Sequence, residues 1–196
     1  HQKLLQALMD LSCRTQARPV VLTFDPHPRA VLFPDNPPDL LTSNRQKVEL
    51  FETFGAEAAV ILNFSPGLAS LSADEFLYEY LLSPCLDLAG ICVGRHWRFG
   101  TRGEGNVEYL CRAGERHEFE VVSVDELQWH GKPVSSTRIR NALRAGRLKT
   151  AERMLGRPYA IRGHVVHGKG MGSKTFHCPT ANLAVTELLL PPNGVY

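Results

Sequence analysis

The sequence predicts an α/β fold in which a parallel β-sheet carries helices on both faces. Short apolar runs alternate with segments of helical periodicity over the first two-thirds of the 196 residues. These runs are apolar at successive positions, which is typical of strands buried on both faces. After residues 156–158 the helices stop, and a strand-like pattern indicates the start of an all-β domain. We therefore expect one domain over residues 1–155 and the first part of another over residues 156–196.

Each element has its own local signal. The apolar runs predict strands at residues 19–24, 58–62, 88–93 and 117–124, and a strand-like pattern follows at 159–167. Helical spacing and capping residues predict helices at residues 2–11, 45–54, 72–82, 106–112, 136–145 and 150–155. The start signal at 72–82 is a capping box, because Ser72 is followed three residues later by Glu75.

Composition restricts the class of partner. The formal net charge is +2 with acids and bases interspersed, whereas nucleic-acid-binding proteins usually concentrate basic residues on one face. No apolar stretch approaches the length of a membrane span. The five cysteines are scattered without a C-x-x-C pair, which is typical of a reduced protein. We expect a cytoplasmic protein that acts on small molecules, without nucleic-acid or membrane partners; nothing in the sequence sets its oligomeric state.

The strongest candidate site is the start of the helix predicted at 136–145. Ser135, Ser136 and Thr137 bring hydroxyls to a place where backbone N–H groups lack intrahelical partners, which suits an anion. Arg140 could add a charge-assisted, two-pronged contact to a phosphate. The alternative interpretation is an ordinary surface helix capped by serine.

The loop after the strand at 19–24 is a second candidate, because ligands of parallel α/β sheets lie at the carboxyl ends of strands. Two prolines make the loop rigid and could hold Asp25 or His27 toward a ligand. The alternative is a rigid connection that contains an Asx turn.

The loop at residues 94–100, after the third predicted strand, is a third candidate. It places arginines beside aromatic residues between two glycines, which suits a flat ring or an anion. The alternative is a half-buried loop in which Trp97 and Phe99 anchor the core.

The glycine-rich segment at 168–175 resembles a P-loop only superficially. Gly172 is followed by Ser173 and then Lys174, and no helix is predicted after it. A flap over phosphates and a flexible hairpin turn are the two alternatives. A zinc site there is disfavoured, because His164 and His167 would face opposite sides of a strand and paired-ligand spacing is lacking.

Taken in order, the segments resemble the bacterial bifunctional riboflavin kinase/FAD synthetase family. The matching segments are residues 24–28, 71–76, 93–94 with 98–100, 135–140, 155–159, 163–168, 179–183 and 190–196. The resemblance implies that residues 1–155 form a Rossmann-like nucleotidyltransferase sheet, which transfers AMP from ATP to FMN and yields FAD and pyrophosphate. It implies that residues 156–196 open a small β-barrel that phosphorylates riboflavin to FMN.

The resemblance also implies roles for single residues. The family's S-S-T-x-I-R segment holds the ATP phosphates, a role that carries to Ser135, Ser136, Thr137 and Arg140. The P-T-A-N segment carries ATP and Mg²⁺ binding in the kinase to Thr180 and Asn182, beside the glycine-rich turn with Gly168 and Gly170. The cleft for flavin and nucleotide would be lined by Phe24, Asp25, His27, Gly94, His96, Arg98 and Phe99.

The sequence departs from the family pattern at several places. Of the opening G-x-F-D-G-x-H-x-G-H segment only the last histidine is matched, as His1, so we expect a domain without its N-terminal strand and motif in which His1 assists Arg140 in catalysis. His96 replaces the usual Asp or Asn, residues 177–178 replace Gly-Phe, and the general base of the kinase is expected beyond Tyr196. These departures leave two alternatives open: another nucleotidyltransferase on the same scaffold, or a non-catalytic relative that binds flavin or nucleotide.

Overall fold

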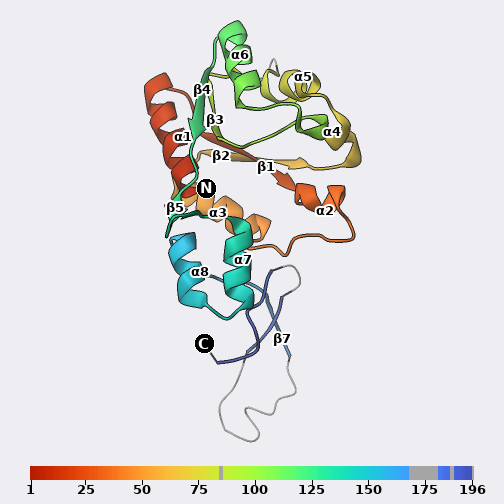
Figure 1. Ribbon diagram of the computed structural model, residues 1–196, viewed down its shortest axis with the longest axis vertical. Coiled ribbons are helices and arrows are strands. Elements are labelled where there is room, and N and C mark those ends of the chain that lie inside the picture. The colour runs from red at the N-terminus through yellow and green to blue at the C-terminus, as the bar shows by residue number, and fades with distance from the viewer. Residues whose placement is uncertain (84–85, 168–180, 186–187, 196) are drawn as a thin grey trace, which may run out of the picture. The chain divides into compact units, whose positions relative to one another are not determined.

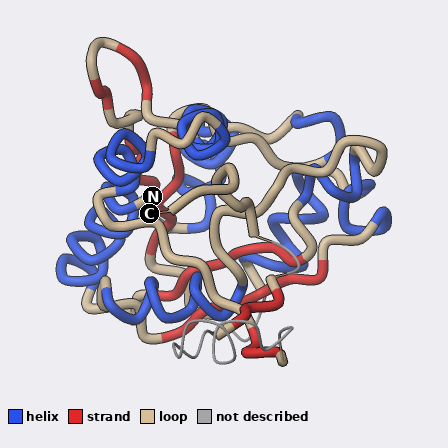
Figure 2. Tube along the Cα trace, turned by 90° about the horizontal axis from the view of Figure 1, so that it is seen from below, coloured by secondary structure: helices blue, strands red, loops and turns tan. Residues whose placement is uncertain are grey.

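The computed structural model describes residues 1–83, 86–167, 181–185 and 188–195. The chain forms two compact units, and each is described here by itself. The first comprises His1–Pro38 and Asn44–Gln128, and the second comprises Asp39–Ser43 and Trp129–Tyr196. Helices and strands alternate along the chain (Figures 1 and 2). The units divide the chain after residue 128, whereas the predicted domain boundary at 155/156 stays a prediction.

The first unit is a mixed α/β structure, as predicted. Its strands are β1 (Val20–Asp25), β2 (Ala58–Asn63), β3 (Gly90–Gly94) and β4 (Glu120–Val124). Its helices are α1 (Gln2–Thr15), α2 (Pro28–Leu32), α3 (Asn44–Thr53), α4 (Pro66–Ser70), α5 (Ala73–Phe76), the π-helix η1 (Leu77–Leu81), the 3₁₀ helix η2 (Thr101–Gly103) and α6 (Val107–His117). Strand β1 pairs with β2 and β3 pairs with β4, both in parallel, with Val20 opposite Ala58 and Gly90 opposite Glu120.

Burial differs between the strands. In β3 the side chain of Val93 is 7% exposed, in agreement with a buried strand. In β2, however, Val60 and Ile61 are 42% and 40% exposed. The prediction that every strand is buried on both faces is therefore wrong for β2. An apolar run shows that a strand is suited to burial, but not how much of each side chain the neighbouring elements cover.

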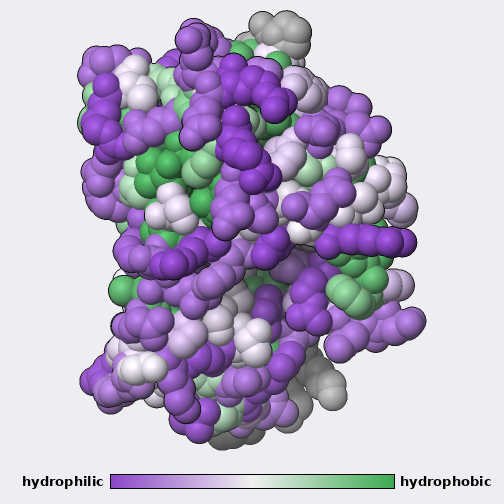
Figure 3. Space-filling model, turned by 45° about the horizontal axis from the view of Figure 1, so that its top comes forward, coloured by the Kyte–Doolittle hydropathy of each residue, from purple (hydrophilic) through white to green (hydrophobic). Residues whose placement is uncertain are grey.

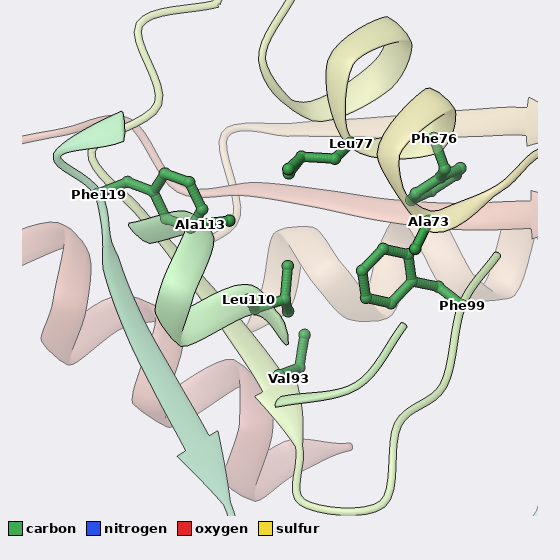
Figure 4. Close-up of a cluster of buried hydrophobic side chains, with 8 residues drawn as sticks. All are labelled: Ala73, Phe76, Leu77, Val93, Phe99, Leu110, Ala113 and Phe119. Atoms are coloured by element: carbon green, nitrogen blue, oxygen red, sulfur yellow. The ribbon is translucent and has the colours of Figure 1, made fainter. Parts of the chain in front are cut away.

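The core of the first unit joins α5, η1, β3 and α6 (Figure 4). Leu110 of α6 is 0% exposed, and Leu77 of η1 is 1% exposed. Phe76 lies at the centre of an aromatic group, with its ring centroid 6.5 Å from that of Phe24 and 5.7 Å from that of Phe99. This packing connects helix α5 to the end of strand β1 and to the loop that follows β3.

Helix ends explain most differences between predicted and observed boundaries. The capping box at Ser72 is confirmed: its hydroxyl accepts a hydrogen bond from the Glu75 N–H at 3.2 Å, and the Glu75 carboxylate accepts one from the Ser72 N–H at 2.7 Å. The Ser72 N–H and the Ser72 hydroxyl, which donates at 2.8 Å, both bind the Glu75 carboxylate and hold its pKa below the ordinary value. Helix α6 continues to His117 and ends at Glu118 in the left-handed conformation, so the predicted strand at 117–124 is shortened to β4.

The second unit contains α7 (Ser136–Arg144) and α8 (Leu148–Leu155), which pack against each other. Strand β7 (His164–Val166) pairs antiparallel with β8 (Asn182–Ala184), so the strand predicted over 159–167 is limited to residues 164–166, near its C-terminal end. The core here is a group of apolar residues: Ile139, Ala142, Leu143, Ala151, Met154 and Leu189.

Three of the short elements that were not predicted have a local signal. Helices α2 and α4 each have proline in their first turn, with a side-chain cap from His27 and Ser65 respectively. The third is the hairpin of β5 (Gln128–Trp129) and β6 (Lys132–Pro133), whose turn residues His130 and Gly131 have φ angles of 52° and 67°. Two positive φ angles are typical of a two-residue hairpin turn.

The face of the molecule shown in Figure 3 is largely polar, with apolar side chains in patches. Among the described residues, no helix is both long enough and apolar enough to cross a membrane.

Candidate functional site

Helix α7 begins where the sequence predicts. Ser135 is its N-cap: the backbone is extended there, and the hydroxyl accepts a hydrogen bond from the Arg138 N–H at 3.3 Å. Ser136 and Thr137 are therefore the first two residues of the helix, where backbone N–H groups have no intrahelical acceptor. The serine-capped surface helix and the phosphate site, the two interpretations of this segment, use the same helix start. The Ser135 cap sets the direction of that helix start in both.

The two arginines of this segment have different partners. The guanidinium of Arg138 donates to the carbonyl oxygens of Lys132 at 2.8 Å and Pro133 at 2.6 Å, and it lies 5.7 Å from the ring centroid of Trp129. Arg138 thus fixes the β5–β6 hairpin to α7. The half-buried Arg140 instead donates from Nε to the carbonyl oxygen of Asp39 at 2.7 Å.

Asp39 is the residue of this region that sequence reasoning missed. Its carbonyl accepts from Arg140, and its carboxylate pairs with Arg144 at 2.6 Å. Asp39 lies 101 residues before Arg140, and no local pattern connects positions so far apart.

In the first unit, the loop after β1 has partners for each candidate side chain. The ring of Phe24 packs edge-on against Phe64 at a centroid distance of 5.4 Å. The Nδ1 of His27 accepts a hydrogen bond from the Arg29 N–H at 3.1 Å and so caps α2. Asp25 attracts the ammonium of Lys47, whose pKa is nevertheless below its ordinary value because burial of the lysine outweighs that attraction. Lys47 is a second residue that the sequence analysis did not single out.

The loop after β3 divides into buried aromatic residues and exposed polar ones. Trp97 stacks on Phe99 with centroids 4.7 Å apart, and Phe99 is 7% exposed. Phe99 is thus a core anchor, in line with the alternative interpretation of this loop. His96 and Arg98 are exposed, so these two side chains are open to solvent at the end of β3, just after Gly94.

Two of the predicted segments, 71–76 and 98–100, pack directly against each other. The Thr101 N–H donates to the Leu71 carbonyl at 2.7 Å, and the Glu104 carboxylate accepts from the Ala73 N–H at 2.7 Å. Gly100 has a φ angle of 72°, and a Cβ there would lie 2.6 Å from the Ala73 backbone nitrogen. The contact between the segments therefore needs glycine at position 100.

We expect Gly100→Ala to lower the free energy of unfolding by about 2–5 kcal/mol. About 1–2 kcal/mol comes from the left-handed backbone, and the rest comes from the overlap with Ala73. Gly131→Ala is the matched control, because Gly131 has a φ of 67° but no atom within 4 Å of its added Cβ. Urea denaturation of both variants measures the difference, and equal losses would contradict the packing argument.

The remaining candidates stay predictions. His1 precedes α1, and its carbonyl accepts a hydrogen bond from the Leu5 N–H at 2.8 Å. It belongs to the first unit and Arg140 to the second. In the kinase segment, Gly168, Gly170 and Thr180 lie outside the described residues, and Asn182 is exposed at the start of β8.

No group of three or more possible metal ligands occurs in the part of the chain that the structure describes. The side-chain oxygen of Asn182 is a hard donor of the kind that Mg²⁺ prefers.

Comparison with known proteins covers the whole chain. The family model for FAD synthetase matches residues 1–138, and the model for riboflavin kinase matches residues 155–196. Proteins named bifunctional riboflavin kinase/FMN adenylyltransferase are 32% identical in Buchnera aphidicola (subsp. Acyrthosiphon pisum), 33% in Escherichia coli K12 and 34% in Pseudomonas fluorescens. Each match covers 100% of this chain and 62% of the relative's length.

A solved structure shares the fold. It is described as a macrolide-efflux protein from Streptococcus pneumoniae, and it superposes with a TM-score of 0.86 at 30% identity, covering 100% of this chain and 63% of that chain. The FAD synthetase model alone accounts for more than half of the chain. The chain therefore belongs to the FAD synthetase family, and its last residues match the riboflavin kinase model.

Proposed function

We propose that the protein to which this chain belongs makes flavin cofactors through two transferase activities. One adenylylates FMN with ATP to give FAD and pyrophosphate, and the other phosphorylates riboflavin with ATP to give FMN. The observation that carries the proposal is the hydroxyl-rich start of α7, capped by Ser135, in a chain that matches both family models in order.

In the adenylylation step, a phosphate oxygen of FMN attacks the α-phosphorus of ATP. The bond from that phosphorus to the bridging oxygen breaks, and pyrophosphate leaves with the electron pair. Protein groups have little covalent work in such a transfer, so catalysis consists mainly of positioning and charge neutralisation.

We assign the leaving pyrophosphate to the start of α7. The N–H groups at the helix start, the helix dipole and the hydroxyls of Ser135, Ser136 and Thr137 suit an anion, and the guanidinium of Arg140 supplies the compensating charge. His1 assists Arg140 in this proposal. The flavin and nucleotide are assigned to the carboxyl ends of β1 and β3 and the loops that follow them, with Phe24, Asp25, His27, Gly94, His96 and Arg98.

For the kinase, we propose that residues 156–196 open a small β-barrel after a first domain that ends at residue 155. Thr180 and Asn182 would hold Mg²⁺ and the ATP phosphates, together with Gly168 and Gly170. The ion, when bound, neutralises phosphate charge. We place the enzyme in the cytoplasm, because cysteines without C-x-x-C pairs are typical of a reducing compartment.

The test uses the purified full-length protein with ATP and a panel of phosphate acceptors. We expect FAD and pyrophosphate from FMN, and FMN from riboflavin in a separate reaction. Transfer of AMP to a different acceptor would favour another nucleotidyltransferase. Binding of FMN and ATP without turnover would favour a non-catalytic relative, and either result would overturn the proposal.

A further inference from the structure

A short segment distant in sequence belongs to the second unit. Residues Asp39–Ser43 group with Trp129–Tyr196, although residues on both sides of that segment belong to the first unit. Leu40 forms a parallel bridge with Leu188, and the Leu189 N–H donates to the Leu40 carbonyl at 2.9 Å. Leu40 lies in the part of the chain that matches FAD synthetase, whereas Leu188 and Leu189 lie in the part that matches riboflavin kinase.

The kinase side of this contact is firmly anchored. Leu189 is 7% exposed and packs in one apolar cluster with Ile139 and Leu143 of α7. Its carbonyl accepts a hydrogen bond from the Tyr159 hydroxyl at 2.7 Å. Burial raises the pKa of Tyr159 above its ordinary value, which keeps the hydroxyl protonated as a donor near neutral pH. Residue 189 therefore has a fixed place against α7.

The other end of the contact reaches the candidate phosphate site. Asp39 directly precedes Leu40, and it binds two arginines that lie one helical turn apart on α7. Its carbonyl holds Nε of Arg140 at 2.7 Å, and its carboxylate holds Nη2 of Arg144 at 2.6 Å. An arginine side chain loses considerable rotamer freedom when it binds a phosphate. A guanidinium already held at Nε has less of this freedom left to lose.

We propose that Asp39 is a positioning residue for Arg140, and that the riboflavin kinase region, through Leu188 and Leu189, holds Asp39 in place. This inference rests on the proposed role of Arg140 in ATP binding. It assigns the kinase region a second role, which is to support the affinity of the adenylyltransferase for ATP. The connection runs from Tyr159 to Leu189, Leu40, Asp39 and Arg140, all within the second unit.

The sign of the Asp39→Ala effect separates positioning from simple electrostatics. Loss of a negative charge near a triphosphate by itself would lower the KM for ATP, because a repulsion is removed. Asp39→Ala keeps the backbone carbonyl that accepts from Arg140, but it removes the carboxylate that pairs with Arg144. If that pair fixes residue 39, its loss lets the carbonyl move away from Arg140, and the KM rises. In the full-length enzyme we expect Asp39→Ala to raise the KM for ATP in FAD formation by about fivefold, a usual size for coupling between sites. It should also lower kcat, because a displaced Arg140 stabilises the leaving pyrophosphate less.

Two further variants test this route of contacts from Tyr159 to Arg140. Tyr159→Phe keeps the ring but removes the hydroxyl that holds Leu189, so it should raise the same KM. Tyr78→Phe is its matched control, because the Tyr78 hydroxyl contacts His117 on the first unit, away from this route, and it should change nothing. In an Arg140→Ala background, Asp39→Ala should have no additional effect.

The outcomes are distinct. A KM that falls or stays constant in Asp39→Ala, or an Asp39 effect that persists without Arg140, overturns the inference and leaves the proposed function intact. If Arg140→Ala itself leaves FAD formation unchanged, the proposed phosphate site fails and the inference about Asp39 fails with it. Riboflavin phosphorylation by Asp39→Ala is measured in parallel, and an unchanged rate shows that the variant is folded.

Discussion

Replacing Arg140 by alanine in the full-length protein is expected to lower the rate of FAD formation by about 10²–10³-fold. The reason is that the departing pyrophosphate gains negative charge as the bond to the α-phosphorus breaks, and a positioned guanidinium stabilises that charge more in the transition state than in bound ATP. Steady-state assays of FAD and pyrophosphate at saturating FMN and ATP measure the loss in kcat.

Arg138→Ala is the matched control for this variant. Both arginines lie in the first half of α7, but the guanidinium of Arg138 is bound to the carbonyl oxygens of the β5–β6 hairpin. We expect Arg138→Ala to reduce stability while the rate, measured below its unfolding temperature, stays within a few-fold of wild type. FAD formation at the wild-type rate by Arg140→Ala would show that the phosphates bind elsewhere.

Arg140→Lys refines the same experiment. Lysine retains the positive charge but has no planar fork and cannot reproduce the guanidinium contacts. If charge alone stabilised the leaving group, the lysine variant would recover most of the rate. We expect only partial recovery, because the bond between Nε of Arg140 and the Asp39 carbonyl depends on the guanidinium geometry.

The residues that the sequence predicted correctly are those with local signals. The start of α7 follows from Ser135, and the start of α5 follows from Ser72 and Glu75, because a cap and its partner lie within three residues of each other. The hairpin at His130–Gly131 also has a local signal, a glycine in a two-residue turn, but its strands are two residues long and carry no periodicity.

Long-range contacts are the part that the sequence could not provide. Nothing near Arg140 indicates that its partner is Asp39, and nothing near Lys47 indicates that it lies close enough to Asp25 to feel its charge. Similarly, the stacked pair of Trp97 and Phe99 could have faced a ligand or the core. Contacts from other elements, Phe76 of α5 and Tyr109 of α6, place Phe99 in the core.

We expect Leu110→Ala to lower the free energy of unfolding by about 2–5 kcal/mol. The side chain of Leu110 is 0% exposed, and it belongs to the cluster that joins α6 to β3 and α5. Alanine removes the apolar contacts and leaves a cavity, and close-packed elements on several sides of the site limit how far it can collapse.

Leu127→Ala is the control that separates the effect of burial from the effect of removing the side-chain atoms. The same atoms are removed, but Leu127 is 58% exposed, so its free energy of unfolding should change by no more than about 0.5 kcal/mol. Urea denaturation followed by fluorescence gives both values. Similar losses in the two variants would mean that burial of Leu110 does not stabilise the core.

Because Val93 at the end of β3 and Phe99 in the following loop belong to the cluster that contains Leu110, a cavity at position 110 should also loosen that loop. Limited proteolysis after Arg98 should then become faster in Leu110→Ala and stay unchanged in Leu127→Ala.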